Sequence, residues 1–177
     1  MTETIPSSRP RQTIARFCTP FLLLFFLAAS SFTTTNSRAE NDEMMQMRDY
    51  ITGYAQNFLG LKYRYAGVTP ATGFDCSGFT SYILKEFDVK VSPSSARQSV
   101  QGMKIALDEV IAGDLVFFGR RGHIQHVAMV VERTAEGIFC VHSTCSRGII
   151  VENISKSKYW KPKIMFARDV ITQQMFK

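Results

Sequence analysis

Three side chains in the sequence have the types that nucleophilic catalysis needs, namely Cys76, His126 and His142. Cys76 lies where a loop meets a predicted helix, in the segment FDCSGF at residues 74–79. A thiol at a helix N-terminus faces the positive end of the helix dipole, which favours the nucleophilic thiolate. Unpaired N–H groups at the same place could receive an oxyanion during acyl transfer. The alternative for Cys76 is a structural cysteine buried in the core.

The two histidines lie at strand ends that a hairpin would bring together. Short apolar segments at residues 127–131 and 138–142 flank a turn centred on residue 135. A hairpin about this centre makes His142 the diagonal cross-strand neighbour of His126 on one face of the sheet. Such neighbours are about 7–8 Å apart, within reach of long side chains. We therefore expect His126 to act as a base for the thiol and His142 to orient it.

A metal site is the alternative interpretation of the same side chains. Two histidines and a cysteine could hold zinc, but the sequence has no Cys-x-x-Cys or His-x-x-x-His spacing. We therefore predict neither a metal nor a cofactor. The third histidine, His123, has the opposite strand parity and lies at a Gly-Arg-Arg-Gly loop, so we expect it on the surface.

Hydrophobic periodicity predicts helices first and strands afterwards. A helix over about 44–59 has apolar residues at steps of three and four, and a second helix over about 76–87 starts beside Asp75, a capping residue. A short polar helix follows at about 94–102. Strands rich in Val, Ile and Phe are predicted at 115–118, 127–131, 138–142, 149–154 and 164–167. This order predicts an α+β domain with an antiparallel sheet.

The first 39 residues have the composition of a secretory signal peptide. Basic residues precede an unbroken apolar run at 21–29, and Ser37 and Ala39 are small residues at the positions that a signal peptidase reads. The alternative is an uncleaved membrane anchor, but the apolar stretch over 17–32 is shorter than the ~20 residues that span a bilayer. We expect cleavage after residue 39.

Composition, net charge and cysteine content narrow the class of protein. The content of 45% hydrophobic and 20% charged residues is that of a globular chain, and a single apolar run excludes a polytopic membrane protein. The chain carries +6, but residues 1–39 hold four Arg and one Glu, so residues 40–177 carry +3. This mild charge suits a polyanionic envelope surface and gives little support to nucleic-acid binding. Three cysteines are left, so at least one thiol is unpaired within the chain; Cys140 and Cys145 could form a disulfide or simply pack.

Six segments, in order, resemble motifs of the NlpC/P60 family of bacterial cell-wall peptidases, which are papain-like cysteine hydrolases. The segments are GLKYRYAG at 60–67, FDCSGF at 74–79, PSSARQ at 93–98, AGDLVFF at 112–118, HVAMVV at 126–131 and HST at 142–144. The resemblance covers residues 60 to 169. It implies a papain-like fold whose N-terminal helices pack on a mostly antiparallel sheet of five to six strands. It also implies a catalytic domain at 40–177 of the minimal, single-domain exported type.

The resemblance implies a role for each matching residue. Cys76 would be the nucleophile, His126 the general base and later the acid, and His142 the residue that orients His126. The implied activity is that of a cysteine-type endopeptidase, which hydrolyses amide bonds in peptidoglycan stem peptides or cross-links through a thioester intermediate. The bond is often the one between D-glutamate and the diamino acid.

Three further positions match family residues that assist the reaction. Tyr63 would lie beside the nucleophile and help to stabilise the oxyanion, or it is an ordinary loop aromatic. Asp75 and Ser77 would bind the amine end of the substrate, although Asp75 could equally be only a helix cap. Ser94 and the pair Val131-Glu132 differ from many members of the family, which affects stem-peptide preference and not the chemistry.

Other functions stay open on the same fold. An amidase or an acyltransferase would use the same three residues, whereas a non-catalytic cell-wall-binding module would keep the fold without needing them. We expect an exported monomer in the periplasm or cell envelope, or a secreted one, that meets the membrane only transiently through its signal segment. Its expected partner is a peptidoglycan stem peptide or muropeptide, and no nucleic acid.

Overall fold

The computed structural model describes residue 1 and residues 21–175, with side chains from residue 37 onward. The chain divides into two compact units, Met1–Glu40 and Asn41–Lys177. The predicted signal peptide at residues 1–39 lies mostly outside the described side chains and stays a prediction. The fold below is that of the second unit.

Helix α1 (Phe21–Gln56) contributes its C-terminal part to the core of the second unit. Periodicity predicts this helix over 44–59, and in the structure it ends at Gln56, followed by a turn up to Gly60. Ile51 and Ala55 are fully buried, which confirms the predicted apolar face. Among the described helices, none has an apolar stretch long enough to cross a membrane.

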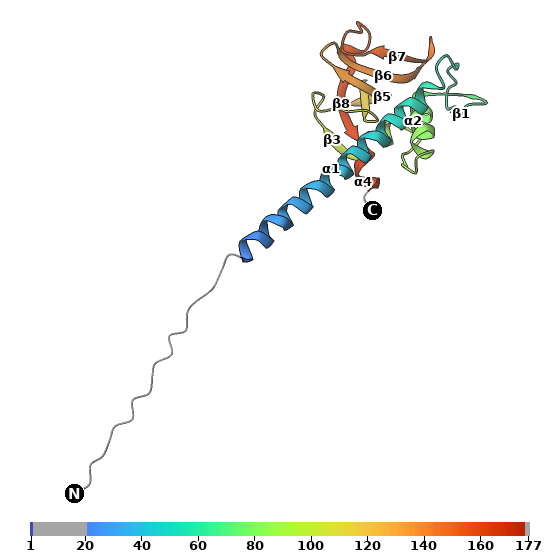
Figure 1. The fold of residues 1–177 in the computed structure, drawn as a ribbon. Coiled ribbons are helices and arrows are strands. Elements are labelled where there is room, and N and C mark those ends of the chain that lie inside the picture. The colour runs from blue at the N-terminus through green and yellow to red at the C-terminus, as the bar shows by residue number, and fades with distance from the viewer. Residues whose placement is uncertain (2–20, 176–177) are drawn as a thin grey trace. The chain divides into compact units, whose positions relative to one another are not determined.

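A six-stranded sheet forms the centre of the unit (Figure 1). Its order is β3-β8-β4-β5-β6-β7 and all neighbouring strands are antiparallel, which confirms the predicted α+β class and the predicted number of strands. The strands are β3 (Met103–Ile105), β4 (Leu115–Arg120), β5 (His123–Thr134), β6 (Gly137–Thr144), β7 (Gly148–Asn153) and β8 (Ile164–Asp169). The remaining elements are β1 (Val68–Thr69), β2 (Gly73–Phe74), α2 (Cys76–Lys85), α3 (Ser95–Gln98), η1 (Lys161–Lys163) and α4 (Thr172–Met175). The edge strand β3 and the two-stranded β1-β2 sheet have no counterpart in the sequence prediction.

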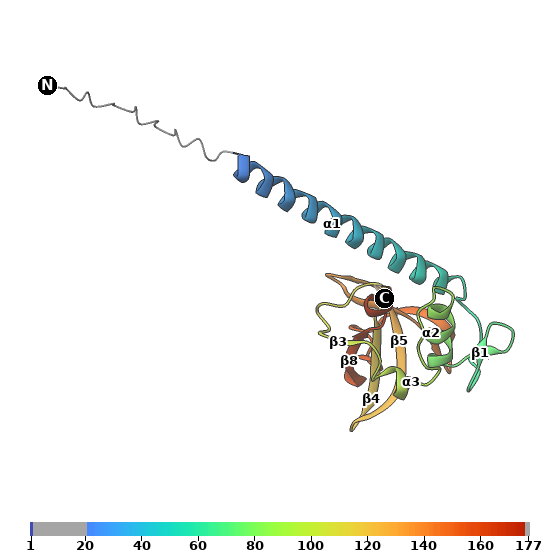
Figure 2. The same cartoon turned by 90° about the horizontal axis from the view of Figure 1, so that it is seen from below.

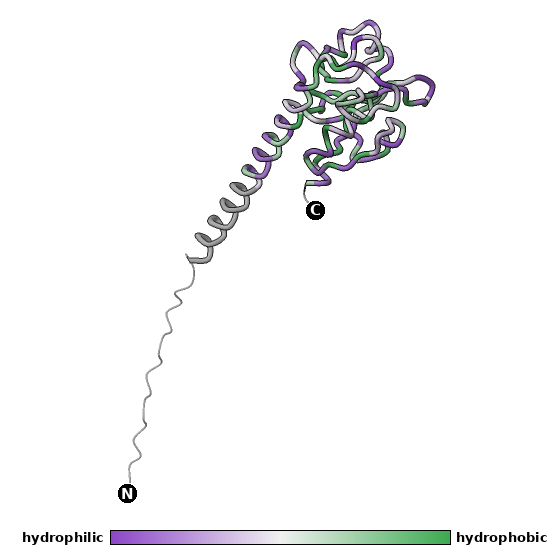
Figure 3. The backbone as a smooth tube through the Cα atoms, turned by 90° about the vertical axis from the view of Figure 1, so that its right-hand side faces the viewer, coloured by the Kyte–Doolittle hydropathy of each residue, from purple (hydrophilic) through white to green (hydrophobic). Residues whose placement is uncertain are grey.

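Both faces of the central strands are buried, which explains why these strands are continuous apolar runs. One face packs under α1 and α2 in a core that includes Phe79, Phe117 and Met129. The opposite face packs against Trp160 and Ile154. Figure 2 shows α2 beside β5, with β4 and β8 following across the sheet. In Figure 3 the hydrophobic segments gather toward the middle of this unit, and the turns at its outside are largely hydrophilic.

The β5–β6 hairpin has the predicted register where the site lies. Met129 pairs with Val141, as a hairpin centred on residue 135 requires. Nearer the turn, Thr134 pairs with Gly137, which is one residue out of that register. A β-bulge between Val130 and Glu132 absorbs the difference. The predicted register is therefore correct at the ends of β5 and β6 that lie away from the turn. It is correct there because of a bulge that the sequence pattern does not reveal.

A buried ion cluster, the arginine cluster, ties α1 to the sheet. Arg48 is fully buried and donates to Asp114 Oδ1 at 2.8 Å and to Asp169 Oδ1 at 2.7 Å. Its guanidinium also donates to the Ala112 carbonyl at 2.8 Å and to Thr172 Oγ1 at 3.0 Å. Since Asp114 precedes β4 and Asp169 ends β8, one side chain joins the helix to two adjacent strands.

Candidate active site

Cys76 is the first residue of α2, as the sequence predicts. Asp75 caps this helix, and its Oδ1 accepts the Gly78 N–H at 2.7 Å. Gly78 is required here because a Cβ at this position would lie 2.0 Å from the Gly67 carbonyl oxygen. The loop and the helix N-terminus can therefore approach closely only with glycine at residue 78.

Hydrogen bonds join Phe74, which lies two residues before Cys76, to neighbouring segments. The Phe74 carbonyl accepts the Ser143 hydroxyl of β6 at 2.7 Å and the Arg64 N–H at 3.0 Å. A short β-bridge also joins Phe74 to Tyr63. The loop that carries Tyr63 and the strand that carries His142 are thus both fixed relative to Cys76.

His126 and His142 form a direct hydrogen bond, with His126 Nε2 2.9 Å from His142 Nδ1. Both side chains are buried. They lie on the same face of the sheet, as predicted from strand parity. A second β-bulge interrupts the β4–β5 pairing beside His126, because Phe118 pairs with His126 and Gly119 pairs with Ile124. Bulges of this kind re-aim side chains next to functional sites.

The indole of Trp160 packs against the face of the His126 ring. The indole stacks on the imidazole with a centroid distance of 4.4 Å and an interplanar angle of 24°. The indole is also 5.1 Å from the His142 ring. The orientation of the base is therefore fixed by stacking as well as by hydrogen bonding.

The histidine pair continues into an acidic residue of β7. His142 Nε2 lies 3.1 Å from Glu152 Oε1. Arg147 Nη2 donates to both Glu152 oxygens, at 2.9 and 3.0 Å. We call His126, His142 and Glu152 the histidine chain.

Burial sets the protonation states of the site. It raises the pKa of the Cys76 thiol to about 11, and the N–H groups of Val127 and Ser77 offset only part of this rise. Burial lowers the pKa of His126 well below its usual value, and the charges of His142 and Lys163 add to the shift. Burial of both groups thus favours a neutral thiol and a neutral imidazole, and it opposes the effect of the helix N-terminus on the thiol.

Tyr63 lies beside Cys76, since the groups that shift its pKa include Cys145, Cys76 and Asp75. Burial raises the pKa of the Tyr63 hydroxyl, and a hydrogen bond with the Cys145 thiol adds to this shift. Its hydroxyl is therefore a neutral O–H group that is able to donate a hydrogen bond. Its role at the oxyanion stays a prediction.

Asp75 and Ser77 both have partners within the protein. Besides capping α2, Asp75 Oδ1 lies 3.1 Å from the Ser77 hydroxyl. The Ser77 hydroxyl also lies 3.2 Å from the Pro93 carbonyl, and this side chain is buried. Asp75 is thus a helix cap in any case, and substrate binding by these two residues stays a prediction.

The remaining histidine and cysteines are not among the three predicted catalytic residues. His123 is exposed at the start of β5, as predicted. Cys140 is buried and Cys145 is exposed, and both thiols are free, so the disulfide considered from the sequence is absent. The two thiols are not bonded because they lie in different surroundings. Cys140 packs in the core around Trp160, whereas Cys145 contacts Tyr63. Within residues 37–175, no group of three or more His, Cys, Asp or Glu side chains is placed to hold a metal ion.

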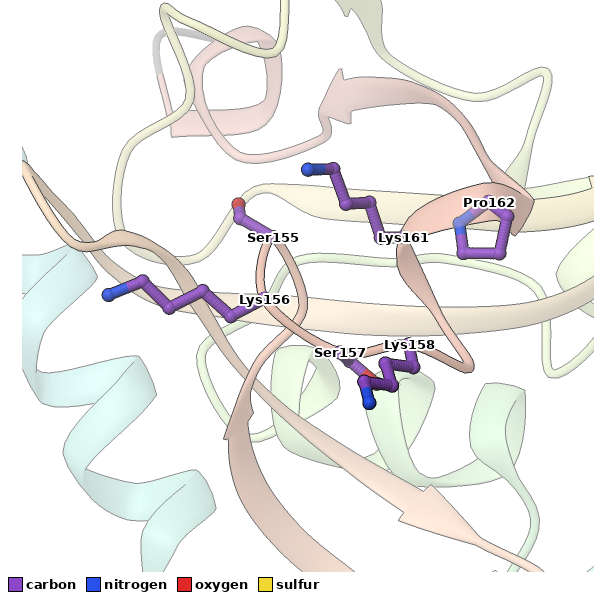
Figure 4. A pocket seen from close by; sticks show the side chains of 6 residues that line it. All are labelled: Ser155, Lys156, Ser157, Lys158, Lys161 and Pro162. Atoms are coloured by element: carbon purple, nitrogen blue, oxygen red, sulfur yellow. The ribbon is translucent and has the colours of Figure 1, made fainter.

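A cavity of about 350 Å³ opens beside the histidine chain. Its lining includes His126, Cys145, Arg147 and Trp160. A larger hollow of about 740 Å³ lies elsewhere, along residues 155–162. Its three lysines extend in different directions and do not converge on a common point (Figure 4). The smaller cavity, which reaches the predicted base, is the candidate substrate site.

Sequence reasoning missed Glu152 and Trp160. Glu152 could have been found from strand parity, because Ile150 pairs with His142 and residue 152 lies on the same face. The signal was an acidic residue inside the apolar run IIVENI. Trp160 is the only tryptophan in the sequence, but it lies in no periodic pattern.

Comparisons with known proteins agree with the geometry. The NlpC/P60 family model matches residues 60–169. The gamma-DL-glutamyl hydrolase of Bacillus subtilis (strain 168) is 33% identical over 138 residues, which are 76% of this chain and 32% of that protein. The gamma-D-glutamyl-L-lysine dipeptidyl-peptidase of Bacillus cereus (strain ATCC 10987) is 37% identical over 97 residues, which are 53% of this chain and 29% of that protein. The chain thus spans about a third of the length of these relatives.

The fold matches that of a solved family member. The crystal structure of an NlpC/P60 family protein from Bacillus cereus ATCC 10987 superposes with a TM-score of 0.64 at 29% identity. The superposition covers 70% of this chain and 40% of that chain. The predicted papain-like fold is thereby confirmed.

Proposed function

Because the chain belongs to the NlpC/P60 family, we propose that it is a cysteine-type endopeptidase that hydrolyses amide bonds in peptidoglycan stem peptides or cross-links. The observation that supports this most is the buried His126–His142 pair, with 2.9 Å between the ring nitrogens. The Cys76 thiol accepts a hydrogen bond from the N–H of Val127, which is the residue next to this base. This hydrogen bond to the neighbour of His126 supports Cys76 as the nucleophile and His126 as its base.

The first half of the reaction forms a thioester. Cys76 Sγ attacks the carbonyl carbon of the substrate amide while the thiol proton passes to His126. The proton moves during the attack because both groups are neutral at rest. The oxyanion is stabilised by N–H groups around Cys76 and by the hydroxyl of Tyr63.

The second half releases the products. His126 gives its proton to the departing amine, and the C–N bond breaks. His126 then takes a proton from water, whose oxygen attacks the thioester carbonyl and frees the Cys76 thiolate; that thiolate regains the proton from His126. His142 keeps the ring of His126 in place throughout, together with the stacked Trp160.

The substrate bond is assigned by comparison with the relatives. The Bacillus cereus relative is named for a γ-D-glutamyl-L-lysine bond and the Bacillus subtilis relative for a γ-glutamyl bond. We therefore propose the bond between D-glutamate and the diamino acid of the stem peptide. The protein acts as an exported monomer in the periplasm or cell envelope, in keeping with the signal peptide expected at residues 1–39.

Mass spectrometry of muropeptides incubated with the purified protein tests this proposal. We expect a new fragment, split after D-glutamate, from the unmodified protein and none from the Cys76→Ala variant. His123→Ala is the control, because His123 is an exposed side chain outside the three predicted catalytic residues, and this variant should still cleave.

The outcomes separate the competing functions. Equal cleavage by the unmodified protein and Cys76→Ala would refute the nucleophile assignment. Fragments that lack the sugar but keep the stem peptide would indicate an amidase, and joined peptides would indicate an acyltransferase. Binding to peptidoglycan without any product would indicate a non-catalytic module.

A further inference from the structure

A buried chain of hydrogen bonds leads from the predicted base to an ion pair at the rim of the cavity. Glu152 is 18% exposed, and Arg147, which binds both of its oxygens, is 54% exposed. Neither residue matches a motif in the sequence, and neither has a part in the acyl transfer described above. The direction of each hydrogen bond in the chain nevertheless decides where the base carries its proton.

The chemistry of the acceptor fixes these directions. An ionised carboxylate only accepts, so His142 Nε2 must carry the proton that it shares with Glu152 Oε1. A neutral imidazole carries one proton, which leaves His142 Nδ1 as an acceptor. His126 Nε2 must then donate to it across 2.9 Å. The remaining nitrogen, His126 Nδ1, is left unprotonated.

We propose that Glu152 is a positioning residue that sets the tautomers of His142 and His126, and so leaves His126 Nδ1 free to accept the thiol proton. Arg147 supports this role by orienting the carboxylate of Glu152 through two hydrogen bonds. The opposite tautomer would place a proton on His126 Nδ1 and leave no base toward Cys76. The role rests on the proposed function for its catalytic meaning, but the proton positions themselves do not depend on it.

The protonation states of the histidines agree with this assignment. Burial lowers the pKa of His142, although the charge and hydrogen bond of Glu152 oppose the shift. Both rings are therefore neutral at neutral pH, and a neutral ring has two tautomers between which a partner must choose. When His126 accepts the thiol proton, it keeps its Nε2–H bond to His142, and the carboxylate stabilises the resulting imidazolium through the same chain.

Long-range 1H–15N spectra of the labelled protein measure the tautomers directly. The chain has only three histidines, and the exposed His123 serves as an internal reference. In the unmodified protein we expect His126 and His142 to carry the proton on Nε2. Glu152→Leu removes the acceptor, so the Nδ1–H tautomer should appear at both rings, and kcat should fall about 10- to 100-fold with KM little changed.

Two variants distinguish positioning from a merely structural role. Glu152→Gln keeps an acceptor oxygen without the charge, so it should retain the Nε2–H tautomers and recover part of the activity lost in Glu152→Leu. Glu136→Gln is the matched control, because Glu136 is an exposed carboxylate paired with Lys156, and it should change neither spectra nor rate.

A proton on Nδ1 of His142 in the unmodified protein would overturn the proposal. Unchanged tautomers in Glu152→Leu would also overturn it, and so would a Glu152→Leu variant whose tautomers change while its kcat does not. The spectra need no substrate. Failure of the unmodified protein to cleave muropeptides would therefore count against the proposed function and leave the tautomer assignment to be judged on the spectra alone.

Discussion

The arginine cluster and the histidine chain are both polar groups buried against the same sheet, but their chemistry differs. In the first, Arg48 binds Asp114 and Asp169 through guanidinium N–H groups that can only donate. In the second, His126 and His142 each carry one proton that could sit on either nitrogen. The arginine cluster joins α1 to β4 and β8, whereas the histidine chain borders a cavity.

This difference shows how burial serves two purposes in one small domain. The charges of the arginine cluster are paired with one another, so their contribution is to stability. Neutral histidines lose little by burial and keep a proton that can move, so their contribution is to chemistry. Substitutions in the two regions should therefore separate unfolding free energy from turnover.

Arg48→Met should have the largest effect and should act on stability alone. It leaves Asp114 and Asp169 buried without their partner, which costs about 3–5 kcal/mol of unfolding free energy. Urea unfolding measures the loss, and turnover per active site of the folded fraction should stay unchanged. Lys156→Met, which breaks the exposed pair with Glu136, should cost less than about 1 kcal/mol. A comparable loss in both variants would contradict the distinction between buried and exposed pairs.

The reactivity of Cys76 tests whether the site is neutral at rest. With the pKa of the thiol raised to about 11 from an ordinary value of 9.0, the thiolate fraction at pH 7 is about 100-fold below that of an ordinary thiol. Alkylation of Cys76 by iodoacetamide, followed by peptide mass spectrometry, should therefore be slow at pH 7 and should still rise above pH 9. The groups that act on the thiol are the carboxylate of Asp75, which raises its pKa, and the N–H groups of Val127 and Ser77, which lower it.

A flat alkylation rate between pH 6 and pH 9 would contradict this result. It would indicate a preformed thiolate–imidazolium pair, with the helix N-terminus outweighing burial. Alkylation of Cys76 in the urea-unfolded chain gives the reference rate, because the same thiol is then solvated.

The fold was predictable where the sequence carries a period. The apolar face of α1, the start of α2 at Cys76 and all five longer strands follow from spacing and capping residues. The pairing of β8 with β4 did not follow, because strand order depends on packing between distant segments. Arg48 was also missed, since an arginine on a helix is ordinarily solvated and its two carboxylate partners are 66 and 121 residues away.

The site was predictable where it is local. His126 and His142 come together through one hairpin, so parity alone places them on one face. The effect of burial on the pKa of Cys76 could not be predicted, because the depth of burial depends on the whole fold. Glu152 needed the register of a further strand, and Trp160 reaches His126 from a segment without regular spacing.

Tyr63→Phe should have the smallest of these effects and sharpens the comparison at the rim of the site. Tyr63 is partly exposed and bonds the Cys145 thiol, so its loss should leave stability unchanged within about 0.5 kcal/mol. Its hydroxyl is one donor among several near the oxyanion, and a hydrogen bond to a charged group contributes about 1.5 kcal/mol, which is about tenfold in kcat. Cleavage kinetics on a muropeptide measure this change. Cys145→Ala removes the other partner of the same hydrogen bond but keeps the Tyr63 hydroxyl. An equal loss of kcat in both variants would show that only the bond between Tyr63 and Cys145 matters, and that Tyr63 does not donate to the oxyanion.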